Sequence, residues 1–239
     1  MIDKSFLQDY STKNETSFEN VLREYVQHMF LRSFYAEKNS QYFLFKGGTA
    51  LRLVFGSPRF SEDLDFTGLL DSNTYEKVLE DTLVSLSREG VLVDIMESKT
   101  TTGGHLASLR IDIFGKQVEI GNQVSFRRKS KVIGENAIVS SSLSPSYNVY
   151  ILARRTLLGE KLTALLTRGK PRDFFDLYFI LRNDKLRLEL NLSKALVEKI
   201  AVSLEKQDKV DLEREVKRFL PKSFWEVAKN LPSALSKEL

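Results

Sequence analysis

The chain has no cysteine among its 239 residues and only two histidines. Without thiols it holds no disulfide framework, thiol nucleophile or thiolate metal site. The second histidine, His105, follows a Thr/Gly-rich segment at 100–104 that predicts a flexible loop, and no other His or Cys stands near it at metal-ligand spacing, so we expect it at the surface. An apolar N-terminal signal and any apolar run of about 18 residues are also missing, which favours a soluble, cytoplasmic protein without a membrane partner.

Apolar residues make up 42% of the chain, which is enough for a buried core. A capping-box pattern at 16–19, TSFE, predicts the start of a helix. Up to about residue 150 the apolar pattern gives helix, strand, helix, strand, helix and a strand hairpin, and beyond it only helices. This order predicts an α+β fold, with a mixed β-sheet flanked by helices in residues 1–150 and a helical domain in residues 151–239.

The segment 44–66, LFKGGTALRLVFGSPRFSEDLDF, ends in two aspartates on a predicted strand. Successive side chains of a strand point to opposite faces, so Asp63 and Asp65 project together while Leu64 and Phe66 face a core. Mg²⁺ is commonly held by one or two carboxylates, with phosphate oxygens and water completing its shell. The pair therefore predicts a magnesium site that binds a nucleotide.

The same segment contains a double glycine between a strand and a short helix. Gly47 and Gly48 allow the backbone to approach a ligand closely, and the helix that begins near Thr49 points its N–H groups and positive dipole end at an anion. Lys46 adds a charge, and Arg59 offers a bidentate phosphate contact. Taken alone, a double glycine is more often a plain turn and an Asp-x-Asp triplet an exposed acidic edge; their order here favours a phosphate site.

Three motifs together resemble a known family. KGGTALRL at 46–53, RFSEDLDF at 59–66 and KLTALLTRGKPRDFFDLYFIL at 161–181 are similar to the AbiEii/AbiGii-type toxins of the nucleotidyltransferase superfamily, which include the MenT-like toxins of type IV toxin–antitoxin systems. The resemblance covers roughly residues 15–181 and implies the nucleotidyltransferase fold. It implies that Gly47, Gly48 and Thr49 bind nucleotide phosphates and that Asp63 and Asp65 bind metal.

A third carboxylate is usual in this family on a later strand. The resemblance favours Glu119, in the strand around Val118-Glu119-Ile120, as a catalytic metal ligand. Asp112 is the rival, because residues 106–121 read as a hairpin with Gly115-Lys116 at its turn, which puts both acids on paired strands about 4.8 Å apart. Spacing alone favours neither acid.

Residues 158–181 read as two helices separated by Gly169-Lys170-Pro171. The plain interpretation is a helix hairpin with a solvated basic rim. The resemblance implies that Lys161 and Asp173, with Asp176 as a further candidate, belong to the active site. There Lys161 would neutralise developing phosphate charge, and Asp173 would orient that lysine or an incoming hydroxyl.

The net charge of +4 and pI of 9.1 are modestly basic, but the cations cluster. Such clusters are either a solvated face or contacts to a phosphodiester backbone. They comprise Arg127, Arg128, Lys129 and Lys131, then Arg154 and Arg155, then Arg168, Lys170 and Arg172.

The residues and the resemblance together predict a nucleotidyltransferase that uses two Mg²⁺ ions to move a nucleoside monophosphate from an NTP to an acceptor hydroxyl. The resemblance implies that the acceptor is RNA, in particular the 3′ end of tRNA, and that the protein is a toxin of phage defence or growth arrest with a cognate antitoxin. Three alternatives stay open: a small-molecule acceptor, γ-phosphoryl transfer on the same fold, and a non-catalytic module that binds nucleotide or a partner protein.

Overall fold

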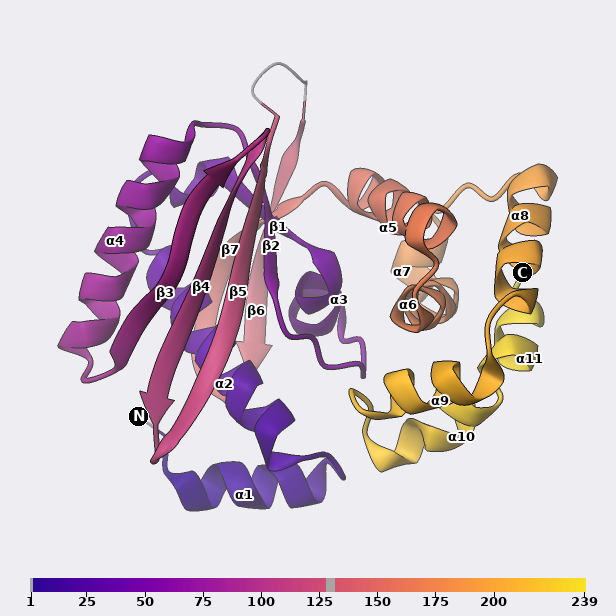
Figure 1. Ribbon diagram of the computed structural model, residues 1–239, viewed down its shortest axis with the longest axis horizontal. Helices are drawn as coiled ribbons and strands as arrows, with labels where there is room; N and C mark the ends of the chain where they lie inside the picture. Colours follow the sequence, from indigo (N-terminus) through magenta and orange to yellow (C-terminus); the bar gives the residue numbers. More distant parts are fainter. Residues whose placement is uncertain (1, 128–131) are drawn as a thin grey trace. The chain divides into compact units, whose positions relative to one another are not determined.

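The computed structural model describes residues 2–127 and 132–239 and divides the chain into two compact units (Figure 1). The sheet unit comprises the residues up to Gly56 and Ser61–Ala153. The helical unit comprises Arg154–Leu239 together with Ser57–Phe60, a short segment from the loop before the Asp-x-Asp strand. Three of the predicted cations, Arg128, Lys129 and Lys131, lie outside the described residues.

The sheet unit is built on a seven-stranded sheet with the strand order β3-β4-β5-β2-β1-β7-β6. The sheet is mixed, because β2 pairs with β1 antiparallel and with β5 parallel, and β1 also pairs with β7 parallel. The strands are β1 Phe43–Lys46, β2 Leu64–Gly68, β3 Leu92–Thr101, β4 Gly104–Ile113, β5 Lys116–Phe126, β6 Gly134–Ser141 and β7 Ser144–Leu152. This is the mixed sheet with flanking helices that the sequence predicts.

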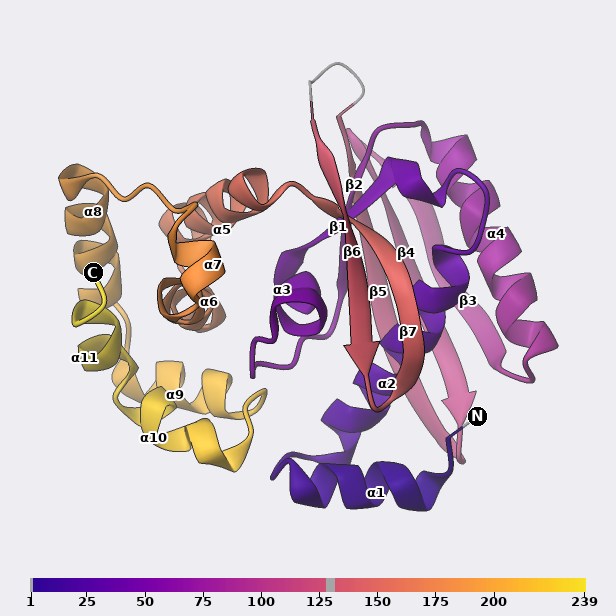
Figure 2. The same ribbon diagram turned by 180° about the vertical axis from the view of Figure 1, so that it is seen from behind.

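Two long helices, α2 and α4, cover one face of this sheet (Figures 1 and 2). Their contact with the sheet is largely aromatic: the Phe34 ring of α2 lies 5.2 Å from Phe66 of β2 and 6.3 Å from Tyr75 of α4. Strands β4 and β5 alternate buried and exposed residues, as expected for strands with one covered face. The helices of this unit are α1 Lys4–Lys13, α2 Phe18–Phe34, α3 Gly47–Phe55 and α4 Ser72–Arg88, with a 3₁₀ turn at Ser40–Tyr42.

The helical unit has its own apolar core, in which Leu165, Phe174 and Phe175 are fully buried. Helices α5 and α6 supply these residues, and the later helices close around them. The elements are α5 Arg154–Arg168, α6 Pro171–Arg182, α7 Asp184–Arg187, α8 Lys194–Glu205, α9 Lys209–Lys217, a 3₁₀ turn at Lys222–Phe224, α10 Trp225–Lys229 and α11 Leu231–Ser236.

Local details differ from the sequence expectations. Helix α2 starts one residue later than predicted, because Ser17 rather than Thr16 caps it and accepts a bond from the Asn20 N–H at 3.2 Å. The β4–β5 turn lies at Phe114-Gly115, where both φ angles are left-handed, 54° and 72°, as in a type I′ hairpin. Lys116 already pairs with Ile113, so the predicted Gly115-Lys116 turn was one residue too late.

The expectation for His105 was wrong, since its exposure is only 2%. The preceding residues up to Thr101 belong to β3 rather than to a flexible loop, and the chain turns at Thr102-Gly103. His105 therefore falls on the covered face of β4, where its ring nitrogens lie 2.9 Å from Ser72 Oγ and 3.0 Å from Ser98 Oγ. The residue is a hydrogen-bonded core histidine.

Candidate active site

The structure brings the double glycine and the second aspartate together. Gly47 begins α3 with φ of +82°, a conformation that L side chains rarely adopt. A Cβ built on Gly47 would lie 2.1 Å from Oδ2 of Asp65 and 2.9 Å from its Cβ. The carboxylate of Asp65 therefore lies against the backbone at the N-terminus of α3, where only a hydrogen atom fits.

The first aspartate makes the same kind of approach to a different strand. A Cβ on Gly121 of β5 would lie 2.7 Å from Oδ1 of Asp63. This agrees with the parallel register, in which Asp65 stands beside Gln123. The backbone carbonyl of Asp63 also accepts a hydrogen bond from Thr49 Oγ1 at 2.5 Å, which ties the residue to α3. Sequence reasoning missed Gly121; a glycine in the middle of a strand was the available signal.

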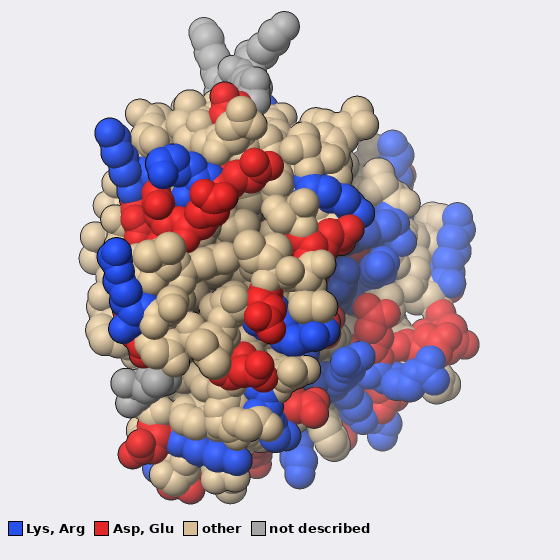
Figure 3. Space-filling view, turned by 60° about the vertical axis from the view of Figure 1, so that its left-hand side comes forward, with Lys and Arg blue, Asp and Glu red and all other residues tan. Residues whose placement is uncertain are grey.

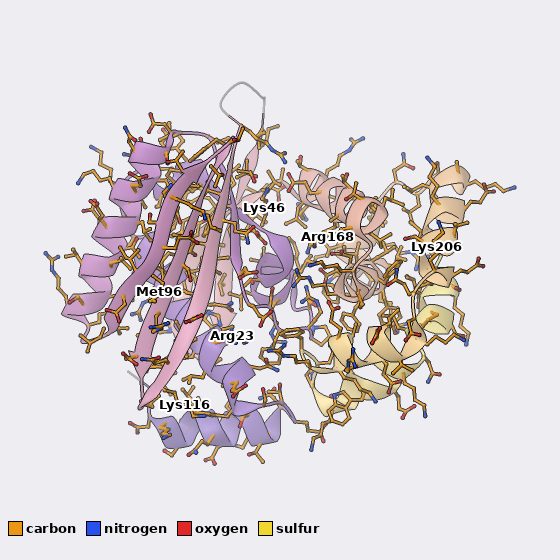
Figure 4. All side chains as sticks on the ribbon, viewed as in Figure 1. Arg23, Lys46, Met96, Lys116, Arg168 and Lys206 are labelled. Atoms are coloured by element: carbon orange, nitrogen blue, oxygen red, sulfur yellow. The ribbon has the colours of Figure 1, made fainter. Side chains whose placement is uncertain are left out.

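The alternation of β2 matches the sequence prediction. Leu64 and Phe66 are fully buried against the helix-covered face, whereas Asp63 and Asp65 are partly exposed on the other face, hereafter the acid face. Lys46 caps α3 and stands directly opposite Asp65 in the antiparallel register, so its side chain belongs to the same face (Figure 4). Around β2 and the start of α3, the acid face thus brings together the carboxylates of Asp63 and Asp65, the ammonium group of Lys46 and a helix N-terminus.

Register also places the two candidates for the third acid. Glu119 is two residues from Gly121 on β5, so it lies on the acid face roughly 7 Å along the strand from the point where Asp63 approaches. Asp112 pairs with Gln117, which puts it on the same face but one strand further out and two residues further along. Glu119 is therefore nearer to the pair. Its side chain is 60% exposed and accepts bonds from Arg110 at 2.9 and 3.2 Å.

The remaining predicted residues belong to the helical unit. Arg59 is only 3% exposed, and its guanidinium donates to both carboxylate oxygens of Asp176 at 2.8 and 3.0 Å. Lys161 Nζ donates to Asp176 Oδ2 at 2.7 Å. Burial alone would raise the pKa of Asp176, but the two cations outweigh it and lower this pKa from 3.8 to about 2. The three side chains form a buried, charge-paired cluster.

Asp173 forms a second pair on the same helix. Its carboxylate receives two hydrogen bonds from Arg168, at 2.9 and 2.7 Å, and one from the Lys170 backbone N–H at 3.1 Å. Arg168 stands at the end of α5, where Figure 4 labels it. Asp173 is 2% exposed, so in this structure it caps α6 and joins it to α5.

The donor set of the acid face fits a magnesium ion, although no group of three or more His, Asp or Glu side chains in residues 2–127 and 132–239 is arranged as a metal cluster. Two carboxylates are as many as Mg²⁺ usually takes from a protein when phosphate oxygens complete its shell. The room that Gly47 leaves lets the Asp65 carboxylate lie beside the α3 N-terminus, and the room at Gly121 lets the Asp63 carboxylate lie against β5 on the same face.

Comparison with known proteins decides the family. The family model for the nucleotidyl transferase AbiEii toxin of type IV toxin–antitoxin systems matches residues 29–232. The chain belongs to the AbiEii toxin family. A search of curated proteins gave no match.

Solved structures show that this AbiEii-family chain has the nucleotidyltransferase fold. MenT4, a nucleotidyltransferase toxin from Mycobacterium tuberculosis, is 17% identical, with a TM-score of 0.63 over 100% of this chain and 91% of its own. JHP933 from Helicobacter pylori is 20% identical, with a TM-score of 0.59 over 94% of each chain. No helix in the described part of the chain is long and apolar enough to cross a membrane.

Charge on the surface is mixed. On the side of the AbiEii-family protein shown in Figure 3, acidic and basic side chains are interspersed with uncharged surface. Some cations of the predicted clusters are in ion pairs, since Arg154 contacts Glu189 at 3.2 Å and Arg168 contacts Asp173.

Proposed function

We propose that this AbiEii-family chain transfers a nucleoside monophosphate from an NTP to an RNA hydroxyl, with two Mg²⁺ ions at the acid face. The observation that supports the proposal is the approach of Asp65 to Gly47, because it brings a carboxylate, the ligand type that Mg²⁺ takes from proteins, beside the N-terminus of a helix. A helix N-terminus receives phosphate, and a carboxylate there needs a divalent cation between it and that phosphate.

Each residue of the acid face has a role in this proposal. Asp63 and Asp65 would hold Mg²⁺, and Glu119 would complete the set next to the attacking hydroxyl. Bound there, the metal supplies charge neutralisation for the attacking and leaving oxygens of an in-line displacement. The backbone N–H groups of Gly47 and Gly48 would donate to the triphosphate, and Lys46 would balance part of its charge.

The proposed acceptor is the 3′ end of tRNA, and the proposed outcome is growth arrest or phage defence under the control of a cognate antitoxin, in the cytoplasm where NTPs and tRNA occur. The toxin family and the clustered cations support this. Lys161 and Asp173 would act on phosphate charge and on the acceptor, as the family resemblance implies. The pairs of Lys161 with Asp176 and of Asp173 with Arg168 would hold both side chains in one conformation.

A labelling experiment tests the chemistry. With Mg²⁺ and tRNA, label from an α-labelled NTP should appear on the RNA, whereas γ-label should leave as pyrophosphate. Asp65→Asn should lower the rate roughly a hundredfold or more, a few kcal/mol of transition-state stabilisation, with normal thermal unfolding. Asp81→Asn, on the outer side of α4 and 46% exposed, is the matched control and should be neutral. Transfer of γ-label, or full activity in Asp65→Asn, would refute the proposal.

A salt titration tests the RNA acceptor. Replacing the four cations at 127–131 with alanine should make the slope of log tRNA affinity against log salt concentration shallower by a few units, about one for each phosphate that is no longer bound. NTP affinity should stay unchanged. A control with the same change in net charge uses four exposed lysines of α8, α9 and the residues between them. These are Lys194, Lys199, Lys206 and Lys209. Equal effects of the two sets would count against a specific RNA contact.

A further inference from the structure

The short segment Ser57–Phe60 belongs to the helical unit, although in the sequence it lies in the loop that leads into β2. Arg59 makes its two bonds to Asp176 and a third, at 3.0 Å, to the carbonyl of Phe60. The Phe60 N–H donates to the Phe219 carbonyl at 2.8 Å, and the Phe60 side chain is 2% exposed. This loop is therefore held by both side-chain and backbone bonds.

The next three residues, 61–63, are hydrogen-bonded to helices of the sheet unit. Gln27 Nε2 of α2 donates to the carbonyl of Ser61 at 3.0 Å and to that of Glu62 at 3.1 Å. The carbonyl of Asp63 accepts from Thr49 Oγ1. Every residue from Arg59 to Asp63 thus has at least one group bonded to a helix or loop outside the segment. Only four peptide bonds, which span at most about 14 Å, separate Arg59 from Asp63, so the two anchored ends of this segment are close neighbours in the chain.

We propose that Arg59 is a positioning residue: its pair with Asp176 fixes the loop that sets the place of Asp63 and Asp65. The proposal rests on the metal-binding role of those acids. It gives Arg59 a different task from the phosphate contact that the sequence predicts, since its Nε and Nη2 donate to a carboxylate inside the helical unit and its Nη1 donates to the Phe60 carbonyl.

The chemistry of the pair explains why arginine stands there. A guanidinium presents two parallel N–H groups to both oxygens of a carboxylate, which fixes the orientation as well as the distance. Lys161 Nζ of α5 also donates to Asp176 Oδ2. The Asp176 carboxylate of α6 therefore joins the loop at Arg59 to both helices. A lysine at position 59 keeps the charge but bonds one oxygen only, so it would hold the loop without fixing its direction.

The test measures metal binding in the free protein as well as transfer. Mn²⁺, as a stand-in for Mg²⁺, is titrated by electron paramagnetic resonance against wild type, Arg59→Gln and Arg59→Lys, below the unfolding temperature of each. Arg59→Gln should lower Mn²⁺ affinity severalfold and transfer at least tenfold, and Arg59→Lys should restore part of the stability but little of the transfer. Arg32→Gln, which removes the ion pair between Arg32 of α2 and Glu89 at the C-terminal end of α4, is the control and should change neither affinity nor transfer.

The outcomes separate the two proposals. If Arg59→Gln unfolds more easily but keeps wild-type Mn²⁺ affinity and transfer while folded, the pair only stabilises the helical unit and the inference is wrong. If Arg59→Gln does not fold, the Mn²⁺ affinity and the transfer rate of Arg59→Lys test the positioning role instead, and wild-type values of both would refute it. If Asp65→Asn also keeps Mn²⁺ binding and transfer, the proposed function fails. If Asp65→Asn loses Mn²⁺ binding and transfer while Arg59→Gln keeps both, only the positioning role of Arg59 is refuted.

Discussion

Replacing Gly121 with alanine probes the place of the Asp63 carboxylate without touching the carboxylate itself. The added Cβ would lie 2.7 Å from Asp63 Oδ1, whereas ordinary contacts are 3.4 Å or longer, so the oxygen has to move by about 0.7 Å. The atom that moves is the far end of a side chain, and Gly121 has no left-handed φ. The strand therefore accepts the alanine, and thermal stability should be unchanged or slightly higher.

The functional cost follows from the same displacement. A misplacement of about 1 Å in a reacting group costs on the order of a hundredfold in rate. For 0.7 Å we expect transfer of α-label to fall roughly tenfold to a hundredfold, or about 1.4 to 2.7 kcal/mol of transition-state stabilisation. The half-saturating Mg²⁺ concentration should rise at the same time, because the displaced atom is a proposed metal ligand.

The matched control is Gly159→Ala in α5. Its added Cβ meets no atom of residues 2–127 and 132–239 within 4 Å and its φ is not left-handed, so the substitution should stabilise the helix by about 0.5–1 kcal/mol without changing transfer. The measurements are thermal unfolding, Mg²⁺ titration and the rate of transfer for both variants. Wild-type rate and Mg²⁺ dependence in Gly121→Ala would refute the claim that Asp63 Oδ1 has to stay against β5.

Three further predictions use other parts of the chain. Glu119→Gln should abolish transfer but leave nucleotide binding nearly intact, with Asp112→Asn milder; reversed severities would move the third-acid role to Asp112. Burial and Arg52 lower the pKa of His28 from 6.5 to about 4, so the unfolded chain takes up a proton first as pH falls. Stability should therefore decline between pH 6.5 and 4 by up to about 3 kcal/mol, and equal pH slopes for wild type and His28→Gln in urea unfolding would contradict this. Asp173→Ala should cost about 1–2 kcal/mol of unfolding free energy, because it removes both the cap and the Arg168 pair, and an unchanged melting temperature would show that the cap contributes nothing.

The local part of the site was predictable from the sequence because it depends on neighbours in the chain. Alternation along a strand puts Asp63 and Asp65 on one face, and the structure has Leu64 and Phe66 buried opposite them. A glycine pair before an apolar helical period predicts a helix that begins near Thr49, and the observed helix α3 begins two residues earlier, at Gly47. These conclusions need no knowledge of which strands pair.

The rest depends on pairing between distant segments, which periodicity does not determine. Gly121 meets Asp63 only because β2 and β5 are parallel neighbours in one register. Arg59 meets Asp176 across 117 residues. A Thr/Gly-rich stretch predicts a loop before His105, whereas Thr100 pairs with His105 and Thr101 with Gly104, so the hairpin continues up to its turn and buries the histidine.

The two glycines also bear on the metal and nucleotide that we propose for the acid pair. An acidic edge that is merely solvated has no reason to lie against backbone, yet Asp65 lies against Gly47 and Asp63 against Gly121. The helix N-terminus and Lys46 supply positive charge beside these carboxylates, but a triphosphate brings about four negative charges of its own, and like charges a few ångströms apart repel strongly. Divalent cations between the carboxylates and the phosphates remove this repulsion. The geometry thus favours joint binding of metal and nucleotide over binding of either one alone.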